Sequence, residues 1–133
     1  MTDDRLALAP LASAAATLRT VMEMAPRTMV VRDSIIKRFE FTYELSWRAM
    51  RRALEAHGTA VDAFSRRNLY REAARFGLID DPETWFEYHA ARNLASHTCN
   101  EDMAVRVVAM MEGFLPAVER LLAALAKFDV DPA

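Results

Sequence analysis

The 133-residue sequence holds a single cysteine and only three glycines. One cysteine cannot form a disulfide within the chain, and with three scattered histidines it cannot complete a closed structural zinc site. The glycines at positions 58, 77 and 113 are too far apart to build a phosphate-binding glycine-rich loop or a dinucleotide fingerprint. We therefore expect no metal site and no cofactor, and any nucleotide has to be bound by side chains and helix ends.

Long apolar runs and a strong net charge are also missing. No apolar stretch approaches the roughly 20 residues that a membrane span requires. The chain starts Met1-Thr2-Asp3-Asp4, which is acidic where a secretory signal peptide is basic. These features predict a cytoplasmic protein with no membrane partner. The formal net charge of −2 argues against a protein that coats nucleic acid by overall positive charge, so any nucleic-acid contact has to be local.

The alternation typical of half-buried strands is absent, and apolar residues instead recur three or four positions apart. This spacing predicts long helices at 11–24 and 30–57, another opening at Asp81-Pro82, and a last one from about residue 101 to 128. A shorter helix is expected between Ser65 and Gly77. The expected fold is all-α: an up-and-down four-helix bundle with one additional short helix, in a single domain over 1–133 whose end, 129–133, is a frayed tail.

The segment from Val30 to His57 is the most regular of these helices. Its main apolar stripe is expected to face the core and consists of Ile36, Phe39, Tyr43, Trp47, Met50 and Leu54. A narrower strip, roughly opposite, holds Phe41 and Leu45, which are candidates for a dimer interface or for contact with another helix of the same chain. The remaining face is expected to be solvated and carries Lys37, Glu40, Glu44, Arg51 and Glu55.

The short helix carries arginines at regular intervals. Arg67, Arg71 and Arg75 are spaced four apart, so they share one face. Two interpretations stay open: an ordinary solvated face near Glu72, or a ridge that binds phosphate. The buried residues of this helix are expected to be Leu69, Ala73 and Phe76.

Residues 92–100 combine a strong anion-binding cation, a side chain that titrates near neutral pH and helix-capping residues. On an unbroken helix the five steps from Arg92 to His97 put the two side chains on different faces. We therefore expect a break here, with Arg92 on the last turn of one helix and His97 in the joint before the next. Two capping patterns could mark the break, a box of Thr98 and Glu101 or Asn100 as the N-cap. Both side chains would then face one space beside a helix N-terminus, which favours anions.

The segment from Arg32 to Trp47 (RDSIIKRFEFTYELSW) closely resembles the bacterial and archaeal nucleotidyltransferase substrate-binding protein family, a branch of the HEPN superfamily. The resemblance continues in the same order through SRRNLYREAARFGLI (65–79), RNLASHTCN (92–100) and FLPAVERLL (114–122). It implies a helical bundle that forms a homodimer and works beside a separately encoded minimal nucleotidyltransferase. The chain is not expected to be that enzyme itself, since it has no glycine-serine loop followed by paired metal-binding aspartates.

The HEPN superfamily also includes metal-independent ribonucleases that use an arginine, a polar residue, three spacers and a histidine. Arg92, Asn93 and His97 match this pattern. The resemblance implies that His97 would move a proton at the ribose 2′-hydroxyl or the leaving oxygen, while Arg92 holds the phosphate. In some toxin–antitoxin members the partner adds AMP to a tyrosine two positions after the histidine. Here that position is Cys99, so this mode of control is not implied for this chain.

Three functions follow as hypotheses. The first is a nucleotide- or substrate-binding and regulatory subunit of a minimal nucleotidyltransferase, in the manner of a toxin–antitoxin pair. Its binding residues would be Arg67, Arg71, Arg92, Asn93, Ser96 and His97. The second is a metal-independent endoribonuclease toxin that cleaves RNA with Arg92, Asn93 and His97. The third is a non-catalytic dimeric helical interaction module in which the motif only caps helices. His57 and His89 are expected to be ordinary structural residues.

Overall fold

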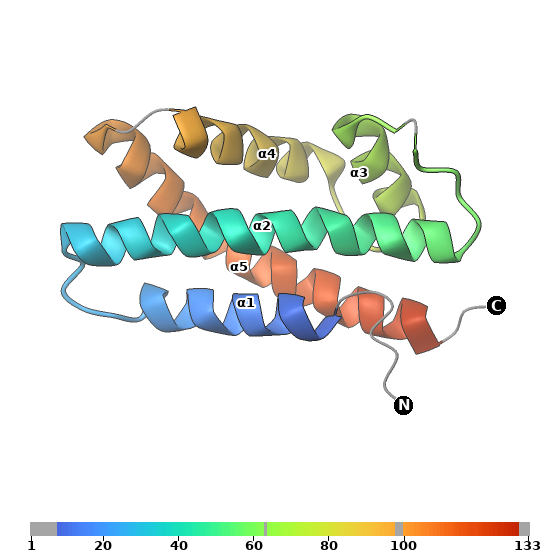
Figure 1. The fold of residues 1–133 in the computed structure, drawn as a ribbon, viewed down its shortest axis with the longest axis horizontal. Helices are drawn as coiled ribbons and strands as arrows, with labels where there is room; N and C mark the ends of the chain where they lie inside the picture. The colour runs from blue at the N-terminus through green and yellow to red at the C-terminus, as the bar shows by residue number, and fades with distance from the viewer. Residues whose placement is uncertain (1–7, 63, 98–99, 131–133) are drawn as a thin grey trace.

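The structure, a computed structural model, describes residues 8–62, 64–97 and 100–130, with side chains except at 97, 129 and 130. These residues contain five α-helices. Their bounds are α1 (Leu8–Met22), α2 (Met29–Ala56), α3 (Arg66–Arg75), α4 (Pro82–His97) and α5 (Glu101–Val130) (Figure 1). No strand occurs among the described residues. The predicted all-α fold with four longer helices and one short one is confirmed.

The helix starts follow from local side-chain chemistry. Ser65 Oγ accepts a hydrogen bond from the backbone N–H of Asn68 at 3.1 Å, and Asp81 Oδ1 accepts one from the N–H of Glu83 at 3.0 Å. Each bond satisfies a first-turn N–H that has no partner within its own helix. The predicted starts of α3 and α4 are therefore confirmed.

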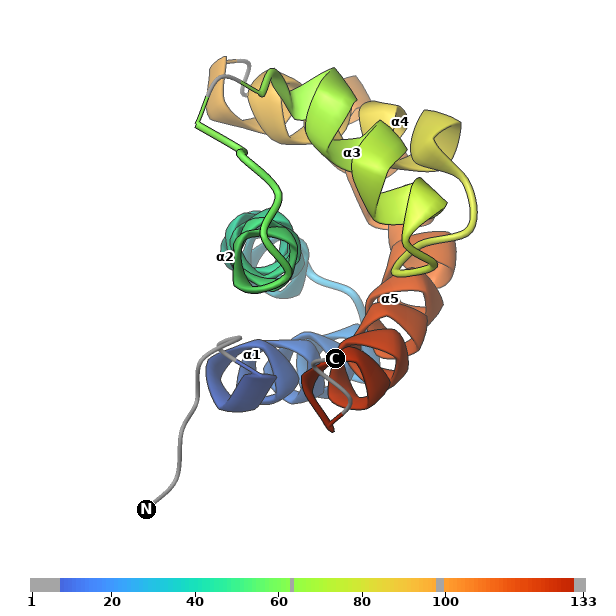
Figure 2. The same cartoon turned by 90° about the vertical axis from the view of Figure 1, so that its right-hand side faces the viewer.

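Helix α2 lies at the centre of the molecule. It contacts all four other helices, while α1 also packs against α5 and α3 lies beside α4. Viewed from the end, α1, α5 and the α3–α4 pair curve around α2 on three sides (Figure 2). This arrangement brings the middle of α2 against α3 and α4, which carry the residues of the predicted site.

Aromatic rings pack against one another at the centre of the bundle. The ring of Phe114 meets those of Phe39 and Tyr88 edge to face, with centroids 4.9 Å apart in both pairs. The predicted α2 stripe is confirmed where its residues are fully buried, but Ile36 and Trp47 are only partly buried. Each lies beside a hollow in the surface instead.

Three further expectations were wrong. Phe76 is 37% exposed rather than buried, because its ring lies at the end of α3 edge-on to that of Phe128. Helix α5 ends at Val130, two residues beyond its predicted end at 128. Helix α1 begins at Leu8, one turn earlier than predicted. None of the described helices combines the length and the apolar character needed to cross a membrane.

Candidate functional site

The predicted break between Arg92 and His97 is not where it was expected. Helix α4 continues through His97, so the two residues lie on one unbroken helix, and the expectation that a helix break turns them toward one space is wrong. The next helix starts at Asn100, whose Oδ1 accepts a hydrogen bond from the N–H of Met103 at 2.8 Å. Of the two proposed capping patterns, Asn100 as N-cap is confirmed. Thr98, Cys99 and the side chain of His97 lie outside the described residues.

Arg92 is held by side chains from its own helix and from α2. Its Nε lies 3.3 Å from Glu44 Oε2 in an ion pair that is not aligned as a hydrogen bond, and Nη1 donates to Ser96 Oγ. The Ser96 hydroxyl in turn donates to Glu40 Oε2 at 3.3 Å. The solvated face expected at Glu40 and Glu44 is therefore wrong at these two positions, because both carboxylates face the α4 motif.

Glu44 also organises the neighbouring surface of α2. Its Oε1 accepts a hydrogen bond from Trp47 Nε1 at 3.2 Å and lies 3.7 Å from Arg48 Nη2. One carboxylate thus faces two cations, Arg48 and Arg92, and orients an indole ring. A phosphate that approached Arg92 would have to compete with this carboxylate.

A second set of contacts centres on the buried hydroxyl of Tyr43. Arg66 Nη1 donates to this oxygen at 2.7 Å, Tyr70 Oη lies 2.5 Å away, and His89 Nδ1 lies 2.8 Å away. The other ring nitrogen of His89 lies 3.4 Å from Asn93 Nδ2. The contacts therefore run from α3 through α2 to Asn93, the polar residue of the predicted motif.

The environment shifts the titration of this cluster. Burial raises the pKa of the hydroxyls of Tyr43 and Tyr70, so both stay protonated. The pKa of His89 is lowered, chiefly by burial and then by the positive charge of Arg66, with Glu44 opposing and Arg92 adding a smaller lowering effect. A neutral imidazole has one donor and one acceptor nitrogen, which suits a bridge between Tyr43 and Asn93.

The predicted arginine ridge on α3 divides into two parts. The guanidinium carbons of Arg67 and Arg71 lie 4.3 and 5.8 Å from the ring centre of Phe86 on α4. Arg75 instead pairs with Glu72 at 3.0 Å on its own helix. Neither Arg67 nor Arg71 forms an ion pair within the described residues. These two arginines therefore lie on the side of α3 that faces α4.

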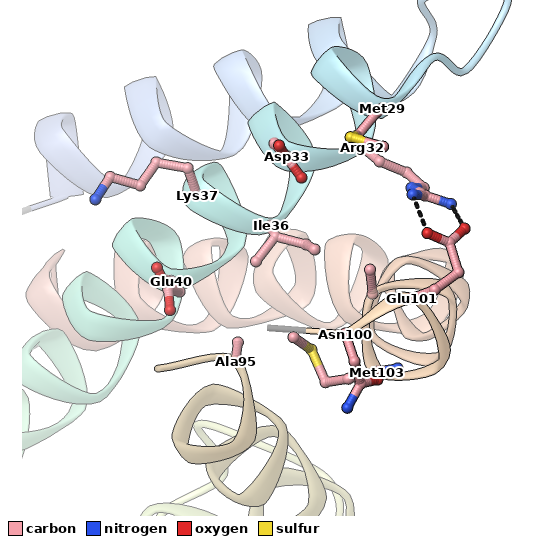
Figure 3. A pocket seen from close by; sticks show the side chains of 11 residues that line it. Met29, Arg32, Asp33, Ile36, Lys37, Glu40, Ala95, Asn100, Glu101 and Met103 are labelled. Carbon is pink, nitrogen blue, oxygen red and sulfur yellow. Dashed lines mark hydrogen bonds and ion pairs between the residues drawn. The ribbon is translucent and has the colours of Figure 1, made fainter. Parts of the chain in front are cut away.

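A pocket of about 450 Å³ adjoins this site between α2 and the joint of α4 and α5. Its apolar lining consists of Met29, Ile36, Ala95, Met103 and Ala104. Figure 3 shows the Arg32–Glu101 pair at one end of it and Glu40 toward the other. The hydrogen bond from Arg32 lowers the pKa of Glu101. Because Glu40 also binds Ser96, the pocket is continuous with the contacts around Arg92.

The two candidate interface residues of α2 differ in exposure. Phe41 is 52% exposed, whereas Leu45 is partly buried against the core.

Among the described residues, no group of three or more His, Cys, Asp or Glu side chains is placed to hold a metal ion.

Sequence reasoning missed Arg66, His89, Glu40 and Glu44 as residues of the site. Arg66 stands beside Arg67 but one helical step away from the regular ridge, so the spacing gave no signal for it. The only signal for His89 was its position one turn before Asn93 on the same helix.

The family model for the nucleotidyltransferase substrate binding protein like family matches residues 6–127. The chain belongs to this family. The family resemblance seen in the sequence is thereby confirmed, and the family description associates its members with nucleotidyltransferases.

Similar proteins agree with membership of the nucleotidyltransferase substrate binding protein like family. The probable ribonuclease HepT of Haemophilus influenzae is 36% identical over 129 residues, covering 86% of this chain and 88% of that protein. A structure from the same organism, described as revealing the fold of a substrate binding domain of a nucleotidyltransferase, matches with a TM-score of 0.78. It is 30% identical over 90% of this chain and 98% of its own. A protein of known structure from Thermus thermophilus has a TM-score of 0.77 and 29% identity over 86% of this chain and 98% of its own.

Proposed function

We propose that this chain is the nucleotide- or substrate-binding and regulatory subunit of a separately encoded minimal nucleotidyltransferase. The observation that carries the proposal is the position of Arg67 and Arg71, which lie against α4 and form no ion pair within the described residues. Guanidinium groups without a carboxylate partner are suited to bind phosphate oxygens in pairs. The family description supplies the class of enzyme that would use the bound substrate.

The proposed binding residues lie on two helices. Arg67 and Arg71 would hold phosphate from α3, while Arg92, Asn93, Ser96 and His97 would contact the ligand from α4. Arg92 is paired with Glu44, so a phosphate bound by Arg92 would take the place of this carboxylate. We infer that this exchange is how ligand binding could be signalled along α2 to the partner.

Capture from the native cell tests the partnership. We expect the tagged full-length chain to retain a small protein that carries a glycine-serine loop and paired aspartates, identified by mass spectrometry. Calorimetry with ATP then tests the site. The double variant Arg67→Ala/Arg71→Ala should bind at least about tenfold more weakly, because each lost phosphate contact is charge-assisted.

The matched control is Arg75→Ala, since Arg75 lies on the same helix but is paired with Glu72. It should bind ATP like the wild type. Capture of no nucleotidyltransferase would refute the partnership, and equal ATP affinity in the double variant and the wild type would refute the site.

A second candidate function is a metal-independent endoribonuclease, a toxin in a toxin–antitoxin pair. It is favoured by the 36% identity to a protein named probable ribonuclease HepT and by the match of Arg92, Asn93 and His97 to the ribonuclease pattern in the sequence. In this function Arg92, once freed from Glu44, would stabilise the phosphate charge and His97 would transfer the proton.

Induced expression of wild type, Arg92→Ala and His97→Ala decides this alternative. The enzyme should slow growth and cleave cellular RNA in the presence of EDTA, and both variants should lose the activity. His57→Ala is the control, because the His57 ring stacks on Phe128 with centroids 3.9 Å apart, away from the motif. Cleavage that survives His97→Ala would exclude this mechanism. If Arg92→Ala lowers thermal stability without changing any binding or activity, the non-catalytic interaction module is the better description.

A further inference from the structure

We propose that Arg66, layered on Trp47, is a stacking platform for a nucleobase beside the phosphate contacts of Arg67 and Arg71. The inference rests on the proposed nucleotide-binding function and specifies its ligand: a nucleobase with its phosphate, either as a mononucleotide or within a single RNA strand. Arg66 and Trp47 are not among the binding residues named above.

The Arg66 guanidinium is fixed in one plane. Its carbon lies 3.8 Å from the ring centre of Trp47, the shortest cation–ring distance among the described residues. Arg66 Nη1 donates to Tyr43 Oη at 2.7 Å, and the Trp47 indole is itself held by Glu44 at 3.2 Å. Both members of the layer are therefore held before any ligand arrives, which lowers the entropy cost of binding.

The positive charge around the Arg66–Trp47 layer is not balanced by carboxylates. Within the described residues Arg66, Arg67 and Arg71 form no ion pair, whereas Arg48, Arg75 and Arg92 nearby are each within 4.0 Å of a carboxylate. Arg67 and Arg71 lie on the side of α3 that faces α4, whereas Arg66 lies over Trp47 of α2. Helix α3 lies between the ends of α2 and α4 (Figure 1). A ligand that carries negative charge is expected there, although the chain as a whole has a net charge of −2.

The layering favours a nucleobase over an acidic peptide. A carboxylate uses only the N–H edges of a guanidinium, and stacking on an indole adds little to that contact. A flat base can instead stack on the guanidinium plane, which is a common mode of binding for unpaired nucleotides. The platform is also joined to the α4 motif by the contacts of Tyr43 with His89 and of His89 with Asn93.

The test compares Arg66→Lys with the wild type in the full-length protein. Lysine keeps the positive charge and loses the planar face. We expect Arg66→Lys to weaken binding of AMP or of a labelled eight-nucleotide oligo(A) by about tenfold, the effect of losing one stacked base. Ribose 5-phosphate and an abasic oligonucleotide of the same length should bind weakly to the wild type and be little affected by the substitution. AMP binding would identify a mononucleotide site, and binding of the oligonucleotide alone would identify a strand.

The control variant is Arg75→Lys, which alters an arginine that also lies over a ring but is paired with Glu72. Thermal unfolding confirms that each variant is folded. The platform would be overturned if the wild type bound the abasic and the natural oligonucleotide equally well. It would also be overturned if polyglutamate displaced the bound nucleotide as well as unlabelled nucleotide does. Capture of the nucleotidyltransferase does not require Arg66. If the chain captures this enzyme but Arg66→Lys binds AMP and oligo(A) as the wild type does, this inference alone is refuted. If no nucleotidyltransferase is captured but Arg66→Lys weakens binding, the partnership alone is refuted.

Discussion

A single hydroxyl, that of Tyr43, joins three helices. A phenol has one O–H donor and two acceptor positions, and this oxygen has three partners: Arg66, Tyr70 and His89. Arg66 donates, so Tyr43 must donate to one of the other two and accept from the other. The side chain is fully buried, as its place in the apolar stripe predicted, but its polar end makes it part of the site.

Removal of this hydroxyl should therefore destabilise the protein. Tyr43→Phe leaves three polar groups without their shared partner, at an expected cost of about 1–3 kcal/mol. Urea unfolding measures the change. Tyr88→Phe is the matched control, because Tyr88 is equally part of the core and its hydroxyl has no hydrogen bond among the described residues. Equal losses in the two variants would contradict the importance of the Tyr43 contacts.

His89 makes stability depend on pH. Its pKa in the folded chain is lowered from the ordinary value of 6.5 by burial and by Arg66 and Arg92, while Glu44 opposes them. The unfolded chain therefore binds a proton at His89 more readily than the folded chain does. Stability contributed by neutral His89 is complete above the unfolded pKa and is lost as the pH falls through and below about 6.5.

The corresponding variant is His89→Gln, which keeps hydrogen-bonding groups but does not titrate. Between pH 7.5 and pH 5 it should lose less free energy of unfolding than the wild type. Chemical denaturation at both pH values measures this difference. His57→Gln serves as the comparison, and an identical pH response of His89→Gln and the wild type would count against the assignment.

At the scale of helices, α5 contains a glycine without a conformational need for it. Gly113 lies in the helix interior, and a Cβ added there would meet Tyr88 Oη at 3.7 Å, an ordinary contact. Gly113→Ala should raise stability by about 0.5–1 kcal/mol, since alanine loses less entropy in a helix. Thermal unfolding checks the shift. Gly77→Ala should have the opposite effect because Gly77 has a φ of +81°, and stabilisation by both changes would contradict this account.

The starts of α3 and α4 were predictable, and the end of α4 was not. Ser65, Asp81 and Asn100 cap their helices through contacts within three residues, so their sequence alone carries the signal. The cap at Asn100 indicates where α5 begins but not where α4 stops. Leu94 and Ala95 favour helix, and α4 continues to His97.

At the scale of the whole molecule, we propose a homodimer that uses Phe41 and Leu45. Phe41 is 52% exposed at the middle of the central helix, away from the helix ends, and a large apolar side chain in this position is suited to a contact with a second copy of the chain. Phe41→Asp should shift the protein from dimer to monomer without loss of helix content. Light scattering after size-exclusion chromatography measures the mass, and circular dichroism measures the helix content.

Val30→Asp provides the control for this change. Val30 is 74% exposed at the start of the same helix, one turn before Ser34, and is not part of the proposed interface. It should leave the mass unchanged. A monomeric wild type, or equal behaviour of the two variants, would contradict the proposed interface.

Periodicity, caps and motifs are local properties of the chain, so the residues alone indicated most of the helices, most of the core and the family. The contacts of Glu44 with Arg92 and of Tyr43 with Arg66 and His89 followed only from the packing of the helices. Tyr43 and His89 are 46 residues apart, and Ser96 and Glu40 are 56 apart. A charged helix face has the same sequence pattern whether it meets water or another helix, so its partners depend on how the helices pack.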